Sequence, residues 1–219
     1  AALIVSCCGS ADKSSTVEVA SAPATAVIYG DTIVLTQPDL AMGKTINAAL
    51  AERASSREYS AEPLSLEELS GVMWAAAGVN RPNGHLTAPS ALALYPVTVY
   101  AFTAEGVFRY NSELHVLVRE AEGDYRELSA AQDFAYTAPL NLVYVADLSK
   151  FDGKGIDRTK AEFLAGQDAA GYAENVNLYA AGNGLKAITR GSLKSAEVLS
   201  LLSLDPKQYA VVLAQTVGK

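Results

Sequence analysis

The sequence predicts a single α+β domain in which helices flank a central, mostly antiparallel or mixed sheet. Half of the 219 residues are hydrophobic and 19% are charged, which supplies enough apolar material for one buried core. Segments with the two-residue period of strands and segments with the 3.6-residue period of helices both occur. The two kinds do not alternate strictly along the chain, which favours an α+β arrangement over a doubly wound one.

Composition argues against several classes of function. The formal net charge of −7 is unfavourable for nucleic-acid binding, because phosphate backbones bind basic surfaces. No apolar run in the sequence approaches the roughly 20 residues that span a bilayer. Two cysteines and two histidines are few for a structural zinc site. We therefore expect no nucleic-acid partner and no bound metal.

The first eight residues resemble the end of a bacterial lipoprotein signal, in which a small residue precedes a cysteine that is lipidated after cleavage. On this interpretation Cys7 carries a lipid anchor, residues 9–27 form a flexible tether, and residues 28–219 form the folded domain. The expected location is the bacterial cell envelope, periplasmic or at the surface, with the anchor as the link to the membrane. Alternatives stay open: Cys7 and Cys8 form a vicinal redox pair, or the segment is an ordinary strand. Without a lipobox the domain is expected in the cytoplasm.

Two helices are predicted in the first part of the domain. Residues 45–54 place apolar side chains on one helical face. Ser65 and Glu68 have the spacing of a capping box, which marks the start of a second helix. Apolar positions at helical spacing continue that helix until Gly78 ends it. The residue types at 80–84 then predict a turn.

Four strands are predicted in the middle of the domain. Residues 95–103 alternate between apolar and other side chains, and residues 107–110 and 114–118 follow after short turns. These three strands are expected to form an antiparallel meander. Residues 139–146 are almost continuously apolar, which is typical of a central strand covered on both faces.

The last part of the domain begins with a long helical stretch over residues 160–181. Gly166 and Gly171 lie inside this stretch and are expected to interrupt it. The remaining predicted elements are a strand, a helix and a final strand, over residues 185–189, 195–202 and 209–217.

Motifs for two other chemistries are incomplete. Gly43, Lys44 and Thr45 resemble the end of a phosphate-binding P-loop, but Pro38 occupies the position of its leading glycine and has no N–H to bind phosphate. Ser90 lacks the flanking glycines of a hydrolase nucleophile. Neither a P-loop nucleotidase nor a serine hydrolase is expected.

Residues 53–59 carry two arginines four positions apart with a serine between them. Two guanidinium groups and a hydroxyl near a helix end suit a phosphate monoester, because a guanidinium matches phosphate oxygens in a bidentate way. A solvated surface helix explains the same residues equally well. The segment alone is therefore weak support for a phosphate site.

Two further stretches are suited to a planar ligand. Residues 87–96 are small residues bounded by prolines, which form a stiff loop that a flat ring can approach closely. Residues 182–191 form a glycine-rich corner that offers backbone N–H groups and a positive charge. The alternatives are a tight entry into a strand for the first stretch and a helix end followed by a strand for the second.

The order of these signals resembles the nitroreductase family of flavoenzymes, and within it the SagB-type dehydrogenase branch. The resemblance covers roughly residues 45–218. Its segments are Arg-x-Ser-x-Arg-x-aromatic at 53–59, Leu-Ser-Leu-Glu-Glu-Leu at 64–69, Trp-Ala-Ala-x-Gly-x-Asn-Arg-Pro at 74–82 and Thr-Ala-Pro-Ser-Ala at 87–91. It implies a nitroreductase-like fold and a homodimer that exchanges elements and binds FMN at the subunit interface.

The resemblance also implies a set of cofactor contacts. Contacts to the phosphate and ribityl-pyrimidine end are expected from Arg53, Ser55 and Arg57. The loop that lines one side of the ring is expected to be Pro89, Ser90, Ala91 and Leu92. The corner that meets the flavin from another side is Thr189, Arg190 and Gly191, and Lys219 falls where a basic residue can help hold the phosphate. Ala54 and Ala93 depart from the family pattern, which puts nitroaromatic activity in doubt.

The implied function is FMN-dependent hydride transfer by a ping-pong mechanism. The donor is a nicotinamide or another reduced compound, and the acceptor is a small nitro compound, quinone or heterocycle. No catalytic side chain is expected, because the cofactor performs the chemistry. An envelope location would require an unusual donor, since nicotinamide nucleotides are scarce outside the cytoplasm. The alternatives are an envelope protein that binds flavin or another small molecule without turnover, and an interaction protein without a ligand.

Overall fold

The computed structural model describes residues 27–29 and 31–219. The predicted lipobox with Cys7, and the predicted tether except for its last residue, lie outside the described residues. Within the described part of the chain, no helix is both long enough and apolar enough to cross a bilayer.

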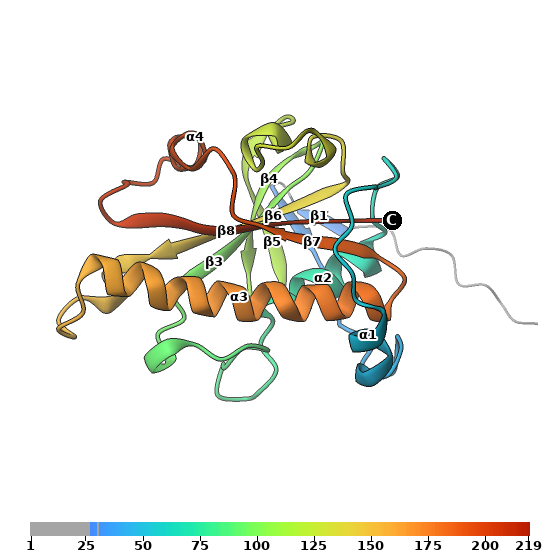
Figure 1. Ribbon diagram of the computed structural model, residues 1–219, viewed down its shortest axis with the longest axis horizontal. Coiled ribbons are helices and arrows are strands. Elements are labelled where there is room, and N and C mark those ends of the chain that lie inside the picture. The colour runs from blue at the N-terminus through green and yellow to red at the C-terminus, as the bar shows by residue number, and fades with distance from the viewer. Residues whose placement is uncertain (1–26, 30) are drawn as a thin grey trace, which may run out of the picture.

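An eight-stranded sheet forms the centre of the fold, in the order β1-β2-β5-β4-β3-β6-β8-β7 (Figure 1). Every neighbouring pair is antiparallel, so the predicted sheet type is confirmed. The strands are β1 (Val27–Tyr29), β2 (Thr32–Val34), β3 (Val97–Phe102), β4 (Gly106–Asn111), β5 (Val116–Glu122), β6 (Leu140–Asp147), β7 (Lys186–Arg190) and β8 (Tyr209–Gly218). The predicted meander is β3-β4-β5. Strand β6 lies between β3 and β8, with all but its last residue buried, which explains its apolar sequence.

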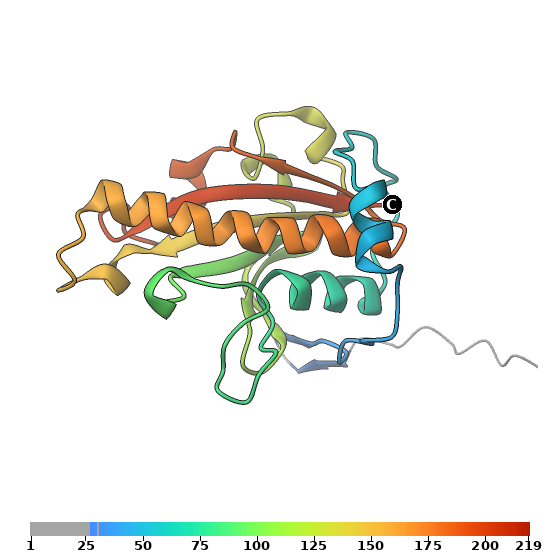
Figure 2. The ribbon, with the colours of Figure 1, turned by 60° about the horizontal axis from the view of Figure 1, so that its bottom comes forward.

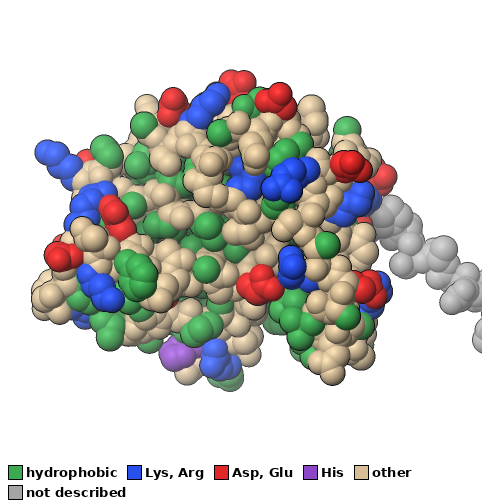
Figure 3. Space-filling model, in the orientation of Figure 1, with side chains coloured by type: hydrophobic (Ala, Val, Ile, Leu, Met, Phe, Trp, Pro, Cys, Tyr) green, Lys and Arg blue, Asp and Glu red, His purple; other side chains and the backbone are tan. Residues whose placement is uncertain are grey.

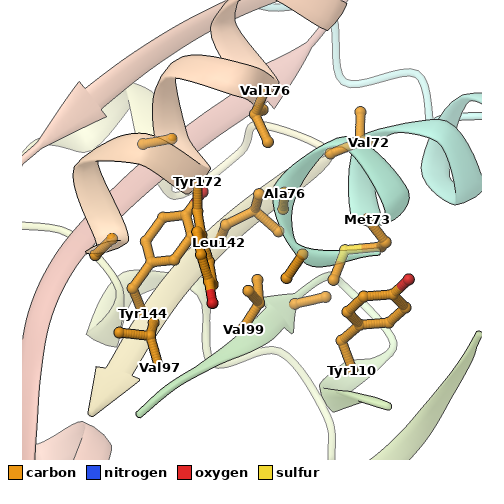
Figure 4. Close-up of a cluster of buried hydrophobic side chains, with 14 of the residues drawn as sticks. Val72, Met73, Ala76, Val97, Val99, Tyr110, Leu142, Tyr144, Tyr172 and Val176 are labelled. Atoms are coloured by element: carbon orange, nitrogen blue, oxygen red, sulfur yellow. The ribbon is translucent and has the colours of Figure 1, made fainter. Parts of the chain in front are cut away.

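Helices cover the two faces of the sheet unequally. On one face α3 (Arg158–Gly182) runs the length of the sheet beside α2 (Leu66–Ala77), and α1 (Ile46–Glu52) packs on the C-terminal end of α3 (Figure 2). The larger core cluster lies under α2 and α3 and includes Val72, Leu142 and Tyr172 (Figure 4). On the other face α4 (Ser195–Leu201) covers a smaller cluster.

The ends of the first two helices follow from local sequence. The predicted capping box is present, since the Ser65 hydroxyl accepts from the Glu68 N–H at 3.1 Å and the Glu68 carboxylate accepts from the Ser65 N–H at 2.7 Å. Gly78 ends α2 as predicted. Thr45 caps α1, but of the predicted apolar face only Ala49 is buried, and Ile46 and Leu50 are exposed.

The expected interruption of the long helix was wrong. Helix α3 is continuous for 25 residues and passes through Gly166 and Gly171. A glycine inside a helix costs about 1 kcal/mol relative to alanine. Burial of an entire side of α3 against the sheet offsets that cost.

Gly71, inside α2, is required by a neighbouring side chain. A Cβ atom at this position would lie 1.8 Å from the Tyr179 hydroxyl oxygen, which contacts the helix backbone from α3. Gly71→Ala is therefore expected to destabilise the fold by about 1 to 3 kcal/mol through overpacking, although alanine favours helices. Urea denaturation measures this change. The control is the double variant Gly71→Ala/Tyr179→Leu, compared with Tyr179→Leu alone. If Gly71→Ala lowered stability as much in that comparison as it does in the wild type, the explanation would be contradicted.

Candidate cofactor site

The arginine loop, residues 53–60, is fixed along the edge of the sheet. After α1 the chain follows edge strand β7, where Ser55 forms a bridge with Ala187 and the Ser56 N–H donates to the Ala187 carbonyl at 3.1 Å. At its other end the Ser60 N–H donates to the Lys219 carbonyl at 2.9 Å. The backbone of the loop is therefore held in place at both ends.

Tyr59 fixes the loop from inside. Its hydroxyl donates to the Ser56 carbonyl at 2.6 Å, and its ring stacks on Phe134 with centroids 6.1 Å apart. Burial raises the pKa of the Tyr59 hydroxyl, an effect that the nearby guanidinium groups of Arg190 and Arg57 oppose. The phenol therefore stays neutral between the two cations.

Arg53 and Arg57 are exposed, and neither guanidinium has a hydrogen-bond or ion-pair partner among residues 27–29 and 31–219. The other six arginines of the chain all have partners: Arg81, Arg109, Arg119, Arg126, Arg158 and Arg190. Two unpaired cations on a fixed loop, with the exposed Ser55 between them, are well placed to bind an anion. Their net positive charge contrasts with the negative charge of the whole chain.

Lys219 lies beside the arginine loop, but its charge is already compensated. Its ammonium group donates to Glu62 at 2.6 Å and lies 3.4 Å from Glu68. The hydrogen bond with Glu62 raises the pKa of Lys219. Of the predicted basic groups, Arg53 and Arg57 are therefore the ones available to an added anion.

Arg190 of β7 lies in the interior, where it binds β6, β8 and the loop that contains Ser129. Its guanidinium donates to the Thr216 hydroxyl at 2.9 Å, the Ser129 carbonyl at 2.8 Å and the Asn141 side-chain oxygen at 3.0 Å. Burial lowers the pKa of Arg190 to about 10. The side chain thus has an internal structural role, and its predicted contact with a flavin stays a prediction.

Strand geometry separates the members of the predicted corner. Successive side chains of β7 point to opposite faces of the sheet. The exposed Thr189 hydroxyl accepts from Asn177 of α3 at 3.2 Å, whereas Arg190 is bound on the opposite face. Gly191 is exposed just beyond the strand. A ligand at this corner would meet the backbone and Thr189 rather than the Arg190 side chain.

Asn177 also connects the corner to the core. Its side-chain oxygen accepts from Gln215 at 2.7 Å, and Gln215 in turn accepts from the Tyr144 hydroxyl at 2.7 Å. Both Gln215 and Tyr144 are fully buried. This chain of hydrogen bonds holds the exposed edge of β7 in a fixed position relative to α3, and the sequence analysis did not identify it.

The serine loop, residues 87–96, lies against the middle of α3. The Ser90 hydroxyl donates to the buried Asp168 carboxylate, and Ala91 is half-buried beside it. Pro89 and Leu92 are exposed and form the outer surface of the loop. Because the Ser90 hydroxyl bonds within the protein, the surface that this loop offers to a ligand is mainly apolar.

The arginine loop and the serine loop do not meet within one chain. They lie on opposite sides of α3, with the serine loop below the helix and β7 above it in Figure 1. The serine loop contacts α3 at Asp168, while α1 packs near Gly182, where Ala49 lies close by. Asp168 and Gly182 are fourteen positions apart in α3, which corresponds to about 20 Å along the helix axis.

One cavity in the described part of the chain is lined by none of the predicted cofactor contacts. It has a volume of about 650 Å³ and is bounded by residues 36–44, α1, α2 and the C-terminal half of α3. The space-filling view shows a notch between the lobe that carries α1 and the rest of the molecule (Figure 3). Trp74 and Tyr179 are among its lining residues. Sequence reasoning gave no indication of this cavity.

Comparisons with known proteins are consistent with one another. A profile described as the nitroreductase family matches residues 50–219. A protein of Methanocaldococcus jannaschii that carries the name nitroreductase is 33% identical over 194 residues, which cover 84% of this chain and 96% of the relative.

Solved structures with the same fold carry related names. A crystal structure from Ralstonia eutropha, also named a nitroreductase, is 35% identical, has a TM-score of 0.80, and aligns over 90% of this chain and 94% of its own. A structure from Desulfovibrio desulfuricans, named as a nitroreductase in complex with FMN, is 21% identical with a TM-score of 0.56. The aligned region covers 80% of this chain and 86% of that one, and at this identity the likeness concerns the fold alone.

Proposed function

The chain belongs to the nitroreductase family of oxidoreductases, and we propose that it uses FMN to transfer a hydride from a reduced donor to a small organic acceptor. The acceptor would be a nitro compound, a quinone or a heterocycle, and turnover would be ping-pong. The observation that carries this proposal is the pair of exposed guanidinium groups of Arg53 and Arg57, which have no partner in the described part of the chain. A phosphate monoester is the ligand group that these residues fit best.

The residues of the chain would bind and orient the cofactor. Arg53 and Arg57 would hold the phosphate, and the Ser55 hydroxyl would add a hydrogen bond between them. Backbone groups at Thr189 and Gly191 would meet one edge of the ring. The isoalloxazine of bound FMN would supply the hydride chemistry. The apolar surface of the serine loop would exclude water from the ring, which strengthens nearby electrostatic interactions.

A homodimer would complete the site. A second copy that packs against the open face of α3 in Figure 1, about a two-fold axis parallel to that face, would bring its serine loop to the β7 side of the first copy. Three large apolar side chains on α1 and α3 support a covered interface, since Phe163, Ile46 and Leu50 are each more than half exposed. Each cofactor would then lie between the arginine loop of one protomer and the serine loop of its partner.

The location and the branch of the family are further proposals that rest on the sequence. Assignment to the SagB-type branch rests on the order and spacing of the segments that begin at residues 53–59 and continue through 64–69, 74–82 and 87–91. A lipid anchor at Cys7 would place the domain in the cell envelope. Mass spectrometry of the full-length protein from its native host tests the anchor, and an unmodified Cys7 thiol would contradict it.

The flavin content of purified protein tests the proposed function. We expect visible flavin absorbance, release of a compound with the mass of FMN, and a content approaching one FMN per chain after incubation with FMN. Bound flavin should be reduced by a donor alone and reoxidised by an acceptor alone, as ping-pong turnover requires. Protein that stays colourless after incubation with FMN would contradict the proposal. Protein that binds FMN but resists reduction by NADH, NADPH and dithionite would favour flavin binding without turnover.

A further inference from the structure

Asp168 is a buried carboxylate that binds a loop rather than a cation. It is 5% exposed, and within the described residues it has no ion pair with a lysine, arginine or histidine. One carboxylate oxygen accepts from the Ser90 hydroxyl, and the other accepts from the Ala91 N–H at 2.9 Å. Both oxygens therefore bind adjacent residues of the serine loop.

The Ser90 hydroxyl extends this attachment to the far end of the loop. It accepts a hydrogen bond from the Tyr95 N–H at 2.8 Å while it donates to Asp168. The Ala93 N–H also donates to the Ser90 carbonyl at 3.0 Å. The loop thus folds around Ser90, and the connection from Tyr95 to α3 runs through one hydroxyl group.

The backbone that these bonds hold is strained. Leu92, Ala93 and Tyr95 have φ angles of 56°, 53° and 46°, in the left-handed region that residues with a Cβ atom disfavour. Such conformations persist only where surrounding interactions over-determine them. They direct the loop outward and leave Leu92 64% exposed at its tip.

We propose that Asp168 is a positioning residue for the cofactor site. It fixes the strained serine loop so that Leu92 and its neighbours present a rigid apolar surface to the flavin bound by the partner protomer. This inference rests on the proposed function, because it requires FMN at the dimer interface. Asp168 acts through Ser90 and Ala91 and does not itself touch the cofactor.

Two variants separate positioning from folding. Asp168→Ala removes both acceptors, whereas Asp168→Asn keeps an acceptor for the Ala91 N–H and offers a donor to the Ser90 oxygen. Asp157→Ala is the matched control, because Asp157 caps the start of the same helix through the Lys160 N–H, at a site remote from the loop. Circular dichroism establishes that each variant is folded.

Hydrogen–deuterium exchange of the cofactor-free dimer and FMN titration provide the two readouts. In Asp168→Ala we expect the amides of Ala91 and Tyr95 to exchange at least about tenfold faster, since charge-assisted hydrogen bonds are lost. The Kd for FMN should rise about tenfold to hundredfold, and the visible spectrum of the bound flavin should shift. Asp168→Asn should restore much of both properties, and Asp157→Ala should alter neither.

The outcomes distinguish this inference from the proposed function. Wild-type protein that binds no FMN would overturn both. Wild-type protein that binds FMN, with an Asp168→Ala variant that matches it in exchange at Ala91 and Tyr95, would overturn the positioning role alone. Faster exchange with unchanged FMN affinity and spectrum would also overturn it, because the loop would then be mobile without consequence for the cofactor.

Discussion

Replacement of both Arg53 and Arg57 by glutamine is expected to weaken FMN binding by a factor of about 10² to 10⁴. Each guanidinium would contribute about 1.5 to 3 kcal/mol through hydrogen bonds to a charged phosphate. Neither group has a partner in the described structure, so the free energy of unfolding should change by less than about 0.5 kcal/mol. The variant therefore removes binding energy without removing a structural contact.

Fluorescence titration with FMN and with riboflavin measures this effect specifically. Riboflavin lacks the phosphate, so its affinity should be the same in the wild-type protein and in the double variant. Arg158→Gln is the control for a loss of surface charge, because Arg158 is exposed and pairs with Glu162. Equal FMN affinity in the double variant and the wild type would contradict the assignment, as would an equal loss of riboflavin binding.

Arg190→Met is expected to destabilise the fold by about 3 to 5 kcal/mol. The change would remove a charged donor from three buried oxygens, on Thr216, Ser129 and Asn141, and Asn141 would keep only the hydrogen bond from the Thr216 hydroxyl. For a chain of this size the loss corresponds to a fall of roughly 10 °C in Tm. Arg190→Lys should recover only part of the stability, because one ammonium group cannot reach all three acceptors.

Urea denaturation in the absence of FMN tests the structural role of Arg190. Arg158→Met is the surface control, with an expected change below about 1 kcal/mol. If Arg190→Met kept wild-type stability and lost only FMN binding, the guanidinium would have the cofactor role that the sequence suggested. A large loss of stability without FMN would instead support the internal role.

Much of the fold was predictable because local signals and tertiary packing agree. The capping box at Ser65 and the apolar run of β6 were both interpreted correctly, since each depends on neighbours in sequence. The continuity of α3 through Gly166 was not predictable, because it depends on burial against the sheet. A helical pattern with two glycines does not reveal how much of the helix is covered.

Less of the candidate site than of the fold could be predicted from the sequence. The segment around Arg53 and Arg57 indicated an anion site from residue types alone. Arg190 could not be distinguished from a ligand-binding arginine, since its partners lie 26 to 61 positions away in the chain. Asp168 was missed because its partner Ser90 is 78 positions distant. A lone acidic residue among alanines in a helix was the one available signal for it.

Subunit complementation tests the division of the site between two chains most directly. Two chains would be co-expressed with different tags, one with Arg53→Gln and Arg57→Gln, and the other with Leu92→Asp in the serine loop. Each homodimer should bind FMN weakly, because both of its sites lack one component. A shared site predicts that the mixed dimer regains one tight site, formed by the intact arginine loop of one chain and the intact serine loop of the other. A mixed dimer without any tight site would contradict the shared arrangement and place each site within a single chain.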